Sequence, residues 1–243
     1  MRMLTRGRYQ ARIAATPGEI AAAQALRNQC FRGVGGHDRD AYDARCDHVL
    51  VEERASGVLV ACFRLLPLAR GKDISQSYSA QYYELSALES FDGPVVELGR
   101  FCIAGSARDP DILRVAWGAM TAYVDDRGFG LLFGCSSFEG VDAERYLDAF
   151  SMLHDRHLAP KRWLPKVKSP QAIRFAERLR GRFDQKRAMG GIPPLLRTYL
   201  AMGGWVSDHA VVDRDLGTLH VFTGVEIARI PAARKRLLRA LVA

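Results

Sequence analysis

Hydrophobic and polar positions change their period along the chain, and these changes predict an alternating order of strands and helices. Strands are expected at residues 9–15, 48–52, 58–66, 94–103, 130–135, 205–212 and 219–225, and helices at residues 17–31, 80–88, 110–127, 142–154, 193–202 and 231–242. A hairpin followed by a strand–helix–strand order predicts a mixed sheet in an α/β or α+β domain, not the parallel sheet of a dinucleotide-binding fold.

Two of the expected helices carry clear end signals. Thr16 and Glu19 have the spacing of a capping box, and Pro17 between them suits the first helical position. Asp109 suits the N-cap of the next long helix, and Gly128 is placed to end it.

Composition narrows the class of protein. The chain has 243 residues and 48% hydrophobic content, which suits one compact domain spanning residues 1–243, with residues 160–243 as a basic C-terminal extension. Its five cysteines are widely spaced and form no CxxC pair, which is typical of a reducing cytoplasm. No apolar run approaches the roughly 20 residues of a transmembrane helix. The net charge of +8 predicts an anionic partner: nucleic acid, an acidic protein or an anionic membrane.

The strand expected at residues 94–103 contains a carboxylate and a guanidinium within a run of apolar residues. Glu97 and Arg100 point to opposite faces of a regular strand unless a bulge intervenes, and Gly99 is a natural place for one. A structural ion pair is one interpretation of these charges. The other is that Glu97 accepts a proton at a catalytic centre, directly or through water.

Three further charged residues have two interpretations each. Asp40 and Asp43 lie in a loop, where carboxylates often only solvate the backbone, but they also suit a cationic substrate. Arg64 lies in an apolar strand, either on an exposed face or as a bidentate clamp for a substrate carboxylate.

The turn of small residues at 104–108, between a strand and the helix after Asp109, predicts an anion site that would suit phosphopantetheine. Walker A, GxGxxG and GxSxG motifs are absent. His154 and His157 have helical spacing, but the sequence suggests no third ligand, so no metal is expected.

Basic residues gather near the C-terminus. Residues 161–187 hold ten Lys or Arg and two acids, and residues 231–242 form a basic amphipathic segment. A solvated face, an acidic carrier protein, an anionic membrane or nucleic acid would each fit the first segment, and a membrane surface or a core-packing helix would fit the second.

Taken together, these segments resemble known acyltransferases. Asp40, Asp43, residues 46–52, residues 64–66 and residues 97–101 resemble the acyl-homoserine-lactone-synthase branch of the GNAT enzymes. Residues 132–138, 192–196 and 199–213 resemble more closely the ornithine-lipid N-acyltransferases. The likeness extends from Arg12 to Ile227. It implies a GNAT-type fold, with a central mixed twisted sheet flanked by helices and a C-terminal extension.

The resemblance implies a reaction and its site. A (3-hydroxy)acyl chain would pass from acyl carrier protein, through its phosphopantetheine, to the α-amine of L-ornithine, giving a lyso-ornithine lipid without metal or redox cofactor. Glu97 would be catalytic. The matched substrate-binding positions are Arg27, Phe31, Asp40, Asp43, Arg64 and Arg100. The expected acyl-donor positions are Phe101, Cys102, Ile103 and Arg108. The expected location is cytoplasmic, peripheral on the inner membrane, and no nucleic acid is expected.

Two departures from these families keep alternatives open. The tryptophan that follows the matched phenylalanine in lactone synthases has no counterpart in residues 32–38, and His220 stands where the ornithine acyltransferases carry an aspartate. The alternatives are a lactone synthase or another N-acyl amino acid synthase, and a non-enzymatic module that binds membrane or nucleic acid. A covalent acyl-cysteine at Cys102 or Cys135 is a rival mechanism, although neither has a histidine base nearby in sequence.

Overall fold

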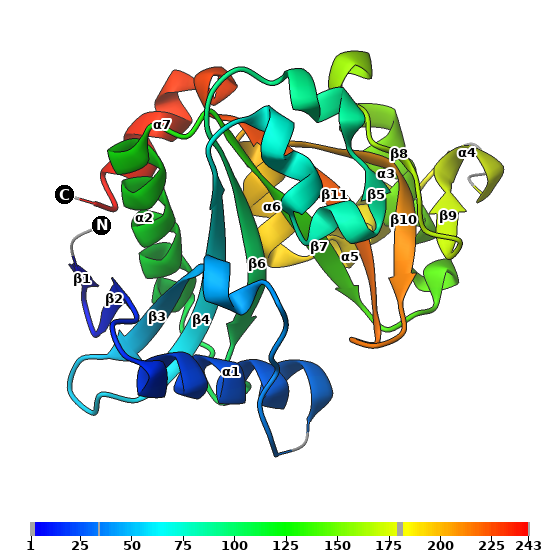
Figure 1. Cartoon of the computed structure of the whole chain (residues 1–243). Coiled ribbons are helices and arrows are strands. Elements are labelled where there is room, and N and C mark those ends of the chain that lie inside the picture. Colours follow the sequence, from blue (N-terminus) through cyan, green and yellow to red (C-terminus); the bar gives the residue numbers. More distant parts are fainter. Residues whose placement is uncertain (1–2, 34, 179–181, 243) are drawn as a thin grey trace. The chain divides into compact units, whose positions relative to one another are not determined.

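The computed structural model describes residues 3–33, 35–178 and 182–242 (Figure 1). Their contacts divide the chain into two compact units. The first unit contains Met1–Pro67, Val96–Phe129 and Ala232–Ala243, and the second contains Leu68–Val95 and Gly130–Pro231. The terminal helix therefore belongs to the same unit as the N-terminal strands.

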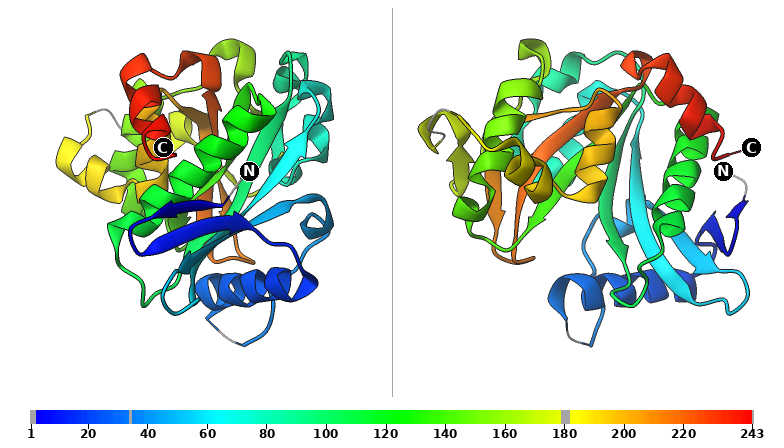
Figure 2. Two further views of the ribbon diagram at one scale, coloured as in Figure 1. Left: turned by 90° about the vertical axis from the view of Figure 1, so that its left-hand side faces the viewer. Right: turned by 180° about the vertical axis from the view of Figure 1, so that it is seen from behind.

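The first unit is built on a sheet with the strand order β1-β2-β3-β4-β6. These strands are Leu4–Arg6, Tyr9–Ile13, Asp47–Glu53, Leu59–Leu68 and Val95–Ile103. Helix α1 (Pro17–Arg32) packs on one face, where Ala23 and Leu26 join a buried cluster with Leu50, Cys62 and Cys102. Helix α2 (Pro110–Arg127) contacts β1, β2 and β3, and α7 (Ala232–Arg239) lies beside it (Figures 1 and 2).

The end signals of α1 and α2 are confirmed. The backbone N–H of Glu19 donates to Thr16 Oγ1 at 3.2 Å, and the N–H of Thr16 donates to Glu19 Oε2 at 3.0 Å, which completes the capping box. At the start of α2, Asp109 accepts from the N–H of Asp111 at 2.9 Å, and Gly128 ends the helix in the left-handed conformation. The capping box fixes the start of the helix that carries Arg27.

The second unit is built on antiparallel strands in the order β7-β11-β10-β9. They are Leu131–Glu139, Thr218–Glu226, Trp205–Asp213 and Ala172–Arg174, and a separate ribbon pairs β5 (Tyr83–Glu84) with β8 (Lys166–Val167). Its helices are α3 (Leu147–Arg156), α4 (Phe175–Arg178), α5 (Gln185–Gly191) and α6 (Pro194–Ala201). Short 3₁₀ turns over both units are Asp43–Arg45, Gly71–Gln76, Ser79–Gln81, Ser86–Ser90, Ala143–Tyr146, Lys161–Trp163 and Ile227–Arg229. Strands β9, β10 and β11 thus come from the region expected to be a C-terminal extension.

The prediction of a helix at residues 80–88 is wrong. The segment instead forms two 3₁₀ turns around β5, in which Tyr83 pairs with Val167. The side chain of Tyr83 is fully buried, and its hydroxyl donates to the carbonyl of His220 at 2.9 Å. The burial of Tyr83 beneath the sheet outweighs the preference of this segment for a helix, which its spacing of apolar residues had indicated. Strands β1, β8 and β9 and helices α4 and α5 carried no sequence signal that we identified.

The face of the second unit's sheet beneath Tyr83 contains two buried histidines. His220 on β11 and His209 on β10 are almost without exposure, and each lies within 5.6 Å of the Tyr83 ring, centroid to centroid. Among the described residues, neither Nε2 atom has a hydrogen-bond partner. Burial first, and then the charge of His209, lowers the pKa of His220 to about 3. His220 is therefore neutral at physiological pH.

This burial predicts a loss of stability in mild acid. The unfolded histidine titrates near 6.5 and the folded one near 3, so between these values only the unfolded chain binds the extra proton, and stability falls as the pH is lowered. Between neutral pH and about pH 5 the loss should be about 2 kcal/mol. Urea titrations across this range should show a shallower pH dependence for His220→Gln. His154→Gln, on the exposed side of α3, is the matched control, and equal slopes for wild type and His220→Gln would contradict the prediction.

Candidate functional site

The site predicted from the sequence lies within the first unit, where three arginines and three aspartates form one network. The arginines come from α1, β4 and β6, and the aspartates all come from the loop between α1 and β3; they are Arg27, Arg64, Arg100, Asp38, Asp40 and Asp43. The loop is therefore attached to the helix and to two strands by charge pairs, and its conformation depends on them.

Arg64 forms the tightest pairing of the network. Its two terminal nitrogens bind the two oxygens of Asp40 at 2.6 and 2.7 Å, and Nη1 also donates to Asp43 Oδ1 at 2.6 Å. The ring of Tyr42 lies 5.8 Å from the guanidinium carbon. Arg64 binds Asp40 in the bidentate geometry that arginine favours, whereas its clamp on a substrate carboxylate stays a prediction. The carboxylates that it holds here belong to the protein.

Arg27 and Arg100 complete the network. Arg27 is almost fully buried and binds Asp38 at 2.7 Å and Asp43 at 2.8 Å. Arg100 binds the same Asp38 at 2.9 Å and Asp40 at 3.3 Å. Every aspartate thus bridges two of these three arginines, whose charges match those of the three aspartates, and Asp38 also lies 3.7 Å from the part-exposed Arg32.

The electrostatics of the network favour the ionised aspartates. Burial raises the pKa of Asp43, but hydrogen bonds and charges from Arg27 and then Arg64 outweigh it and leave the pKa at about 2. Burial likewise opposes ionisation of Asp38, and the charges of Arg100 and Arg27 hold its pKa below the ordinary value. Both are carboxylates at neutral pH, so they stabilise the fold above about pH 4 and lose that effect as the pH falls through their folded values.

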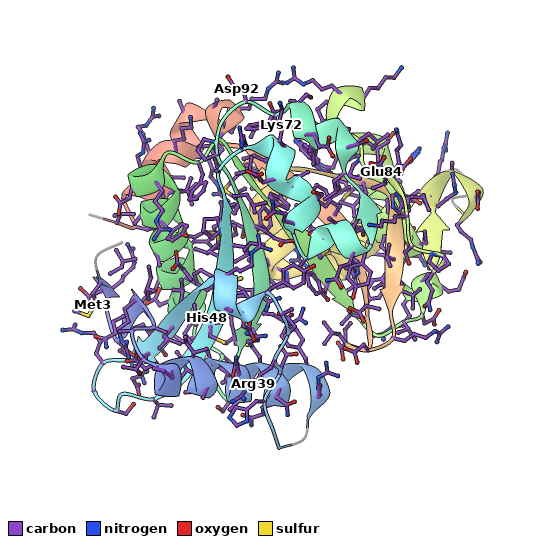
Figure 3. All side chains as sticks on the ribbon, in the orientation of Figure 1. Met3, Arg39, His48, Lys72, Glu84 and Asp92 are labelled. Carbon is purple, nitrogen blue, oxygen red and sulfur yellow. The ribbon has the colours of Figure 1, made fainter. Side chains whose placement is uncertain are left out.

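His48 and Gln24 support the loop, and sequence reasoning had not selected them. His48 lies opposite Arg64 in the β3–β4 register, and its Nε2 is 3.0 Å from the carbonyl oxygen of Asp43 (Figure 3). Burial lowers the pKa of His48, with partial compensation from that hydrogen bond, so the neutral ring donates through Nε2. Gln24 donates to Asp43 Oδ2 at 3.0 Å and accepts from Arg39 at 2.8 Å. The sequence feature that could have indicated His48 is its position at the start of a predicted strand, directly after the loop that contains Asp43.

Strand β6 is irregular near the bulge that the sequence predicted at Gly99, but the unusual backbone conformation lies one residue later, at Arg100. Arg100 has φ +52°, the one positive φ among the described residues other than glycine. Cys102 packs against Cys62 on the α1 face, and a Cβ added to Gly99 would meet Arg64 at 3.5 Å on that same face. Positions three apart share a face only if the alternation slips between them. Regular alternation places Glu97 on the same face as Gly99, and the slip after Gly99 adds Arg100 and Cys102 to that face.

Glu97 is buried beside this charge-balanced network. Only 3% of its surface is exposed. Burial, followed by the charge of Glu97, raises the pKa of Tyr42, and the same charge contributes to the rise in the pKa of Cys46 to about 12. Glu97 therefore adds a further carboxylate beside the paired charges of the network. A carboxylate in such a place can accept a proton or attract a cation.

The end of β6 holds the residues expected to take an acyl donor. Phe101 stacks on Phe63 with ring centroids 5.6 Å apart. The Cys102 Sγ atom lies 3.5 Å from Cys62 Sγ. A hydrogen bond with Cys30 lowers the pKa of Cys102, but the bond to Cys62 and burial raise it well above the ordinary value. A thiol of this kind is a poor nucleophile, which weighs against the covalent mechanism at Cys102.

The turn between β6 and α2 is open to solvent, and a carboxylate already caps the helix N-terminus at which an anion would bind. Arg108 is exposed, and a Cβ at Gly105 would have open space around it. The N-terminus of α2 is capped by Asp109, a carboxylate that also accepts from Tyr9 at 3.2 Å. Phosphopantetheine binding at this turn stays a prediction.

The remaining expectations have different outcomes. Phe31 packs against the hydrophobic cluster under α1, which places it among apolar residues. Within residues 3–33, 35–178 and 182–242, no group of three His, Cys, Asp or Glu residues is arranged to hold a metal ion. In the same ranges, no helix is long and apolar enough to cross a bilayer.

The basic segment at residues 161–187 has fewer open charges than its composition suggests. Five of its cations pair with acids in the second unit, at distances from 2.9 to 3.6 Å; these are Arg162, Lys166, Arg174, Arg178 and Arg187. The ammonium of Lys168 donates to the carbonyl of Ala80 at 2.6 Å. The segment is partly neutralised by its own unit. Arg180 lies outside the described residues.

The network predicts unequal costs for two similar substitutions. Asp38→Asn removes a buried charge from between Arg27 and Arg100 and should lower the free energy of unfolding by about 3–5 kcal/mol. Asp125→Asn removes the exposed partner of Arg239 and should cost about 0–1 kcal/mol. Urea denaturation of both variants measures the difference. A cost for Asp38→Asn no larger than for Asp125→Asn would show that the network adds nothing to stability.

Comparison with known proteins shows the family of the chain. Residues 26–118 match the acetyltransferase (GNAT) domain. L-ornithine N(alpha)-acyltransferase of Rhodobacter capsulatus is 31% identical over 229 residues, 88% of each chain. The L-ornithine N(alpha)-acyltransferase of Rhizobium meliloti is 31% identical over 240 residues, 91% of this chain and 81% of the relative.

Two solved structures share the fold at low identity. FeeM, an N-acyl amino acid synthase from uncultured soil microbes, has a TM-score of 0.52 at 10% identity, covering 91% of this chain and 92% of its own. BjaI, a CoA-dependent acyl-homoserine lactone synthase solved with SAM and isopentyl-CoA, has a TM-score of 0.51 at 11% identity, covering 93% and 83%. The chain has the GNAT fold and belongs to the family of the L-ornithine N(alpha)-acyltransferases.

Proposed function

We propose that this enzyme transfers a (3-hydroxy)fatty acyl group from acyl carrier protein to the α-amine of L-ornithine. The amine nitrogen attacks the thioester carbonyl, the C–N bond forms and the C–S bond breaks. The phosphopantetheine thiol leaves, and the ammonium proton goes to a base. The observation that carries the proposal is Glu97, a carboxylate buried next to a neutralised arginine–aspartate network in a chain of this family.

Glu97 is proposed as the base, acting directly or through one water. An ammonium has no lone pair, so the α-amine must lose a proton before or during attack at neutral pH. A carboxylate in a buried place also favours a cation over neutral competitors, because the protein shields it from bulk water. Both effects would act on the same substrate nitrogen.

The network is proposed to position ornithine. Asp40 is the most exposed of its carboxylates, with 21% of the side chain accessible, against 10% for Asp43 and 2% for Asp38. The second ammonium of ornithine would therefore meet Asp40 first, and Asp43 behind it. Arg64 and Arg100 both hold Asp40 in place, and the same guanidinium groups would donate to the α-carboxylate of the substrate.

The donor is proposed to enter along the end of β6. Backbone N–H groups of Phe101, Cys102 and Ile103 would stabilise the oxyanion of the tetrahedral intermediate, and Arg108 would contact the phosphopantetheine phosphate. Acyl carrier protein is acidic, which suits a chain with a net charge of +8. Peripheral binding to the inner membrane fits a product that is amphiphilic.

Loss of the Glu97 carboxylate should slow turnover strongly without unfolding the protein. With acyl-acyl carrier protein and L-ornithine, Glu97→Gln should lower kcat about 10²–10⁴-fold while KM for the donor changes little, as expected for a general base. Mass spectrometry detects the N-acylornithine product. Glu89→Gln, the same change on an exposed turn, is the control. Full activity in Glu97→Gln would remove Glu97 from the mechanism.

Substrate competition tests the rest of the proposal. Acyl-coenzyme A should be a poorer donor than the acyl carrier protein thioester, and L-ornithine a better acceptor than L-lysine or S-adenosylmethionine. In cells supplied with labelled ornithine, a labelled lyso-lipid should appear with the wild type and not with Glu97→Ala. Release of an acyl-homoserine lactone from S-adenosylmethionine would favour the lactone-synthase alternative.

A further inference from the structure

The two ends of the chain meet on helix α2 in the first unit. A Cβ added to Gly118 of α2 would lie 2.6 Å from Leu4 Cδ2 and 3.3 Å from Leu241 Cβ, so both side chains already contact this glycine. Figures 1 and 2 show that α7 and the N-terminal strands both lie against α2, at different places along it. Glycine at position 118 allows the close approach, since any larger residue would displace Leu4 or Leu241.

Helix α7 is held on α2 by one side only. Leu238 is buried, and Arg239 binds Asp125 at 2.9 Å, which fixes the helix and neutralises that acid. Leu237, the neighbouring residue, is 61% exposed. The helix therefore uses part of its apolar surface to pack and leaves the rest open to solvent.

The open apolar residues at this edge come from both ends of the chain. Met3 is 59% exposed and projects outward beside β1, and Val242 is 38% exposed (Figure 3). With Leu237 they are three of the six large hydrophobic side chains that are exposed among the described residues. We call Met3, Leu237 and Val242, with the basic residues around them, the terminal surface.

Charge identifies the kind of partner that suits the terminal surface. Residues 231–242 contain Arg234, Lys235, Arg236 and Arg239 and no acid, and Arg6 is exposed on β1. Arg236 is exposed, Arg234 and Lys235 are half-buried, and Arg239 pairs with Asp125, so Arg236 and Arg6 present the charge of this surface to solvent. Aliphatic side chains among basic residues, in a segment that contains no acid, match the boundary between acyl chains and anionic headgroups.

We propose that the terminal surface docks the enzyme on an anionic lipid bilayer, with Leu237, Met3 and Val242 entering the headgroup region and the exposed cations Arg6 and Arg236 binding lipid phosphates. The inference deepens the proposed function, since it rests on an amphiphilic product that must reach a membrane. It assigns that contact to the chain ends and not to residues 161–187. Each lysine or arginine near such a surface strengthens binding about fivefold, and a buried leucine about tenfold or more.

Vesicle co-sedimentation of the purified enzyme, without substrates, tests the proposal. The protein should bind vesicles of phosphatidylglycerol and phosphatidylcholine, bind pure phosphatidylcholine weakly, and dissociate at high salt. Leu237→Ser should weaken binding about tenfold, and Arg236→Glu by at least as much. Val58→Ser and Met189→Ser, at exposed apolar positions away from the terminal surface, are matched controls and should bind like the wild type.

The readouts separate this proposal from acyl transfer. Both Leu237→Ser and Arg236→Glu lie on a solvent face, so circular dichroism and turnover with soluble substrates should match the wild type. The docking proposal would be overturned if both variants bound anionic vesicles like the wild type, or if the wild type bound neutral and anionic vesicles equally. Neither result would count against the proposed reaction. Preferential salt-sensitive binding to duplex DNA in place of vesicles would overturn the docking proposal as well. Absence of turnover with normal vesicle binding would count only against the proposed reaction.

Discussion

The first unit depends on the ion pairs that join one loop to three regular elements. Three arginines from α1, β4 and β6 would each be costly to bury alone, and so would the aspartates of the loop. Together they cancel, and their bidentate geometry leaves the loop few alternative positions. Because replacement of buried ion pairs by apolar residues is often neutral for stability, what the network provides is a fixed arrangement of charge around Glu97.

The left-handed backbone at Arg100 is the second part of that arrangement. An arginine in this conformation is disfavoured by about 1 kcal/mol or more, and the pairs with Asp38 and Asp40 compensate for it. The slip that follows puts Glu97 and Arg100 on one face, which regular alternation would forbid. Removal of the Arg100 pairs would therefore disturb the carboxylate three residues earlier in the chain.

The sequence predicts a set of candidate site residues but not the ion pairs that join them. Caps, strands and the need for an irregularity near Gly99 follow from local chemistry, and they were predicted from it. The pairing of Arg64 with Asp40 joins residues 24 positions apart, and no local pattern encodes that distance. For the same reason Asp40 and Asp43 were interpreted as open to a substrate, and the supporting role of His48 was missed. Tyr83 shows the converse, because a tertiary contact with His220 replaced the helix that its local spacing predicted.

Charge cancellation also limits how the site can select an amino acid. A network of three matched pairs exerts little net field at a distance, so it cannot distinguish a dication from a monocation by charge alone. In the proposed site, discrimination would therefore have to arise within a few ångströms, at the part-exposed carboxylate of Asp40 and at Glu97. A substrate ammonium at this place would share Asp40 with Arg64 and Arg100. It could donate only along the hydrogen-bonding directions of that carboxylate which the two arginines do not use. Selectivity for ornithine would then reflect the separation of its two amines more than their number.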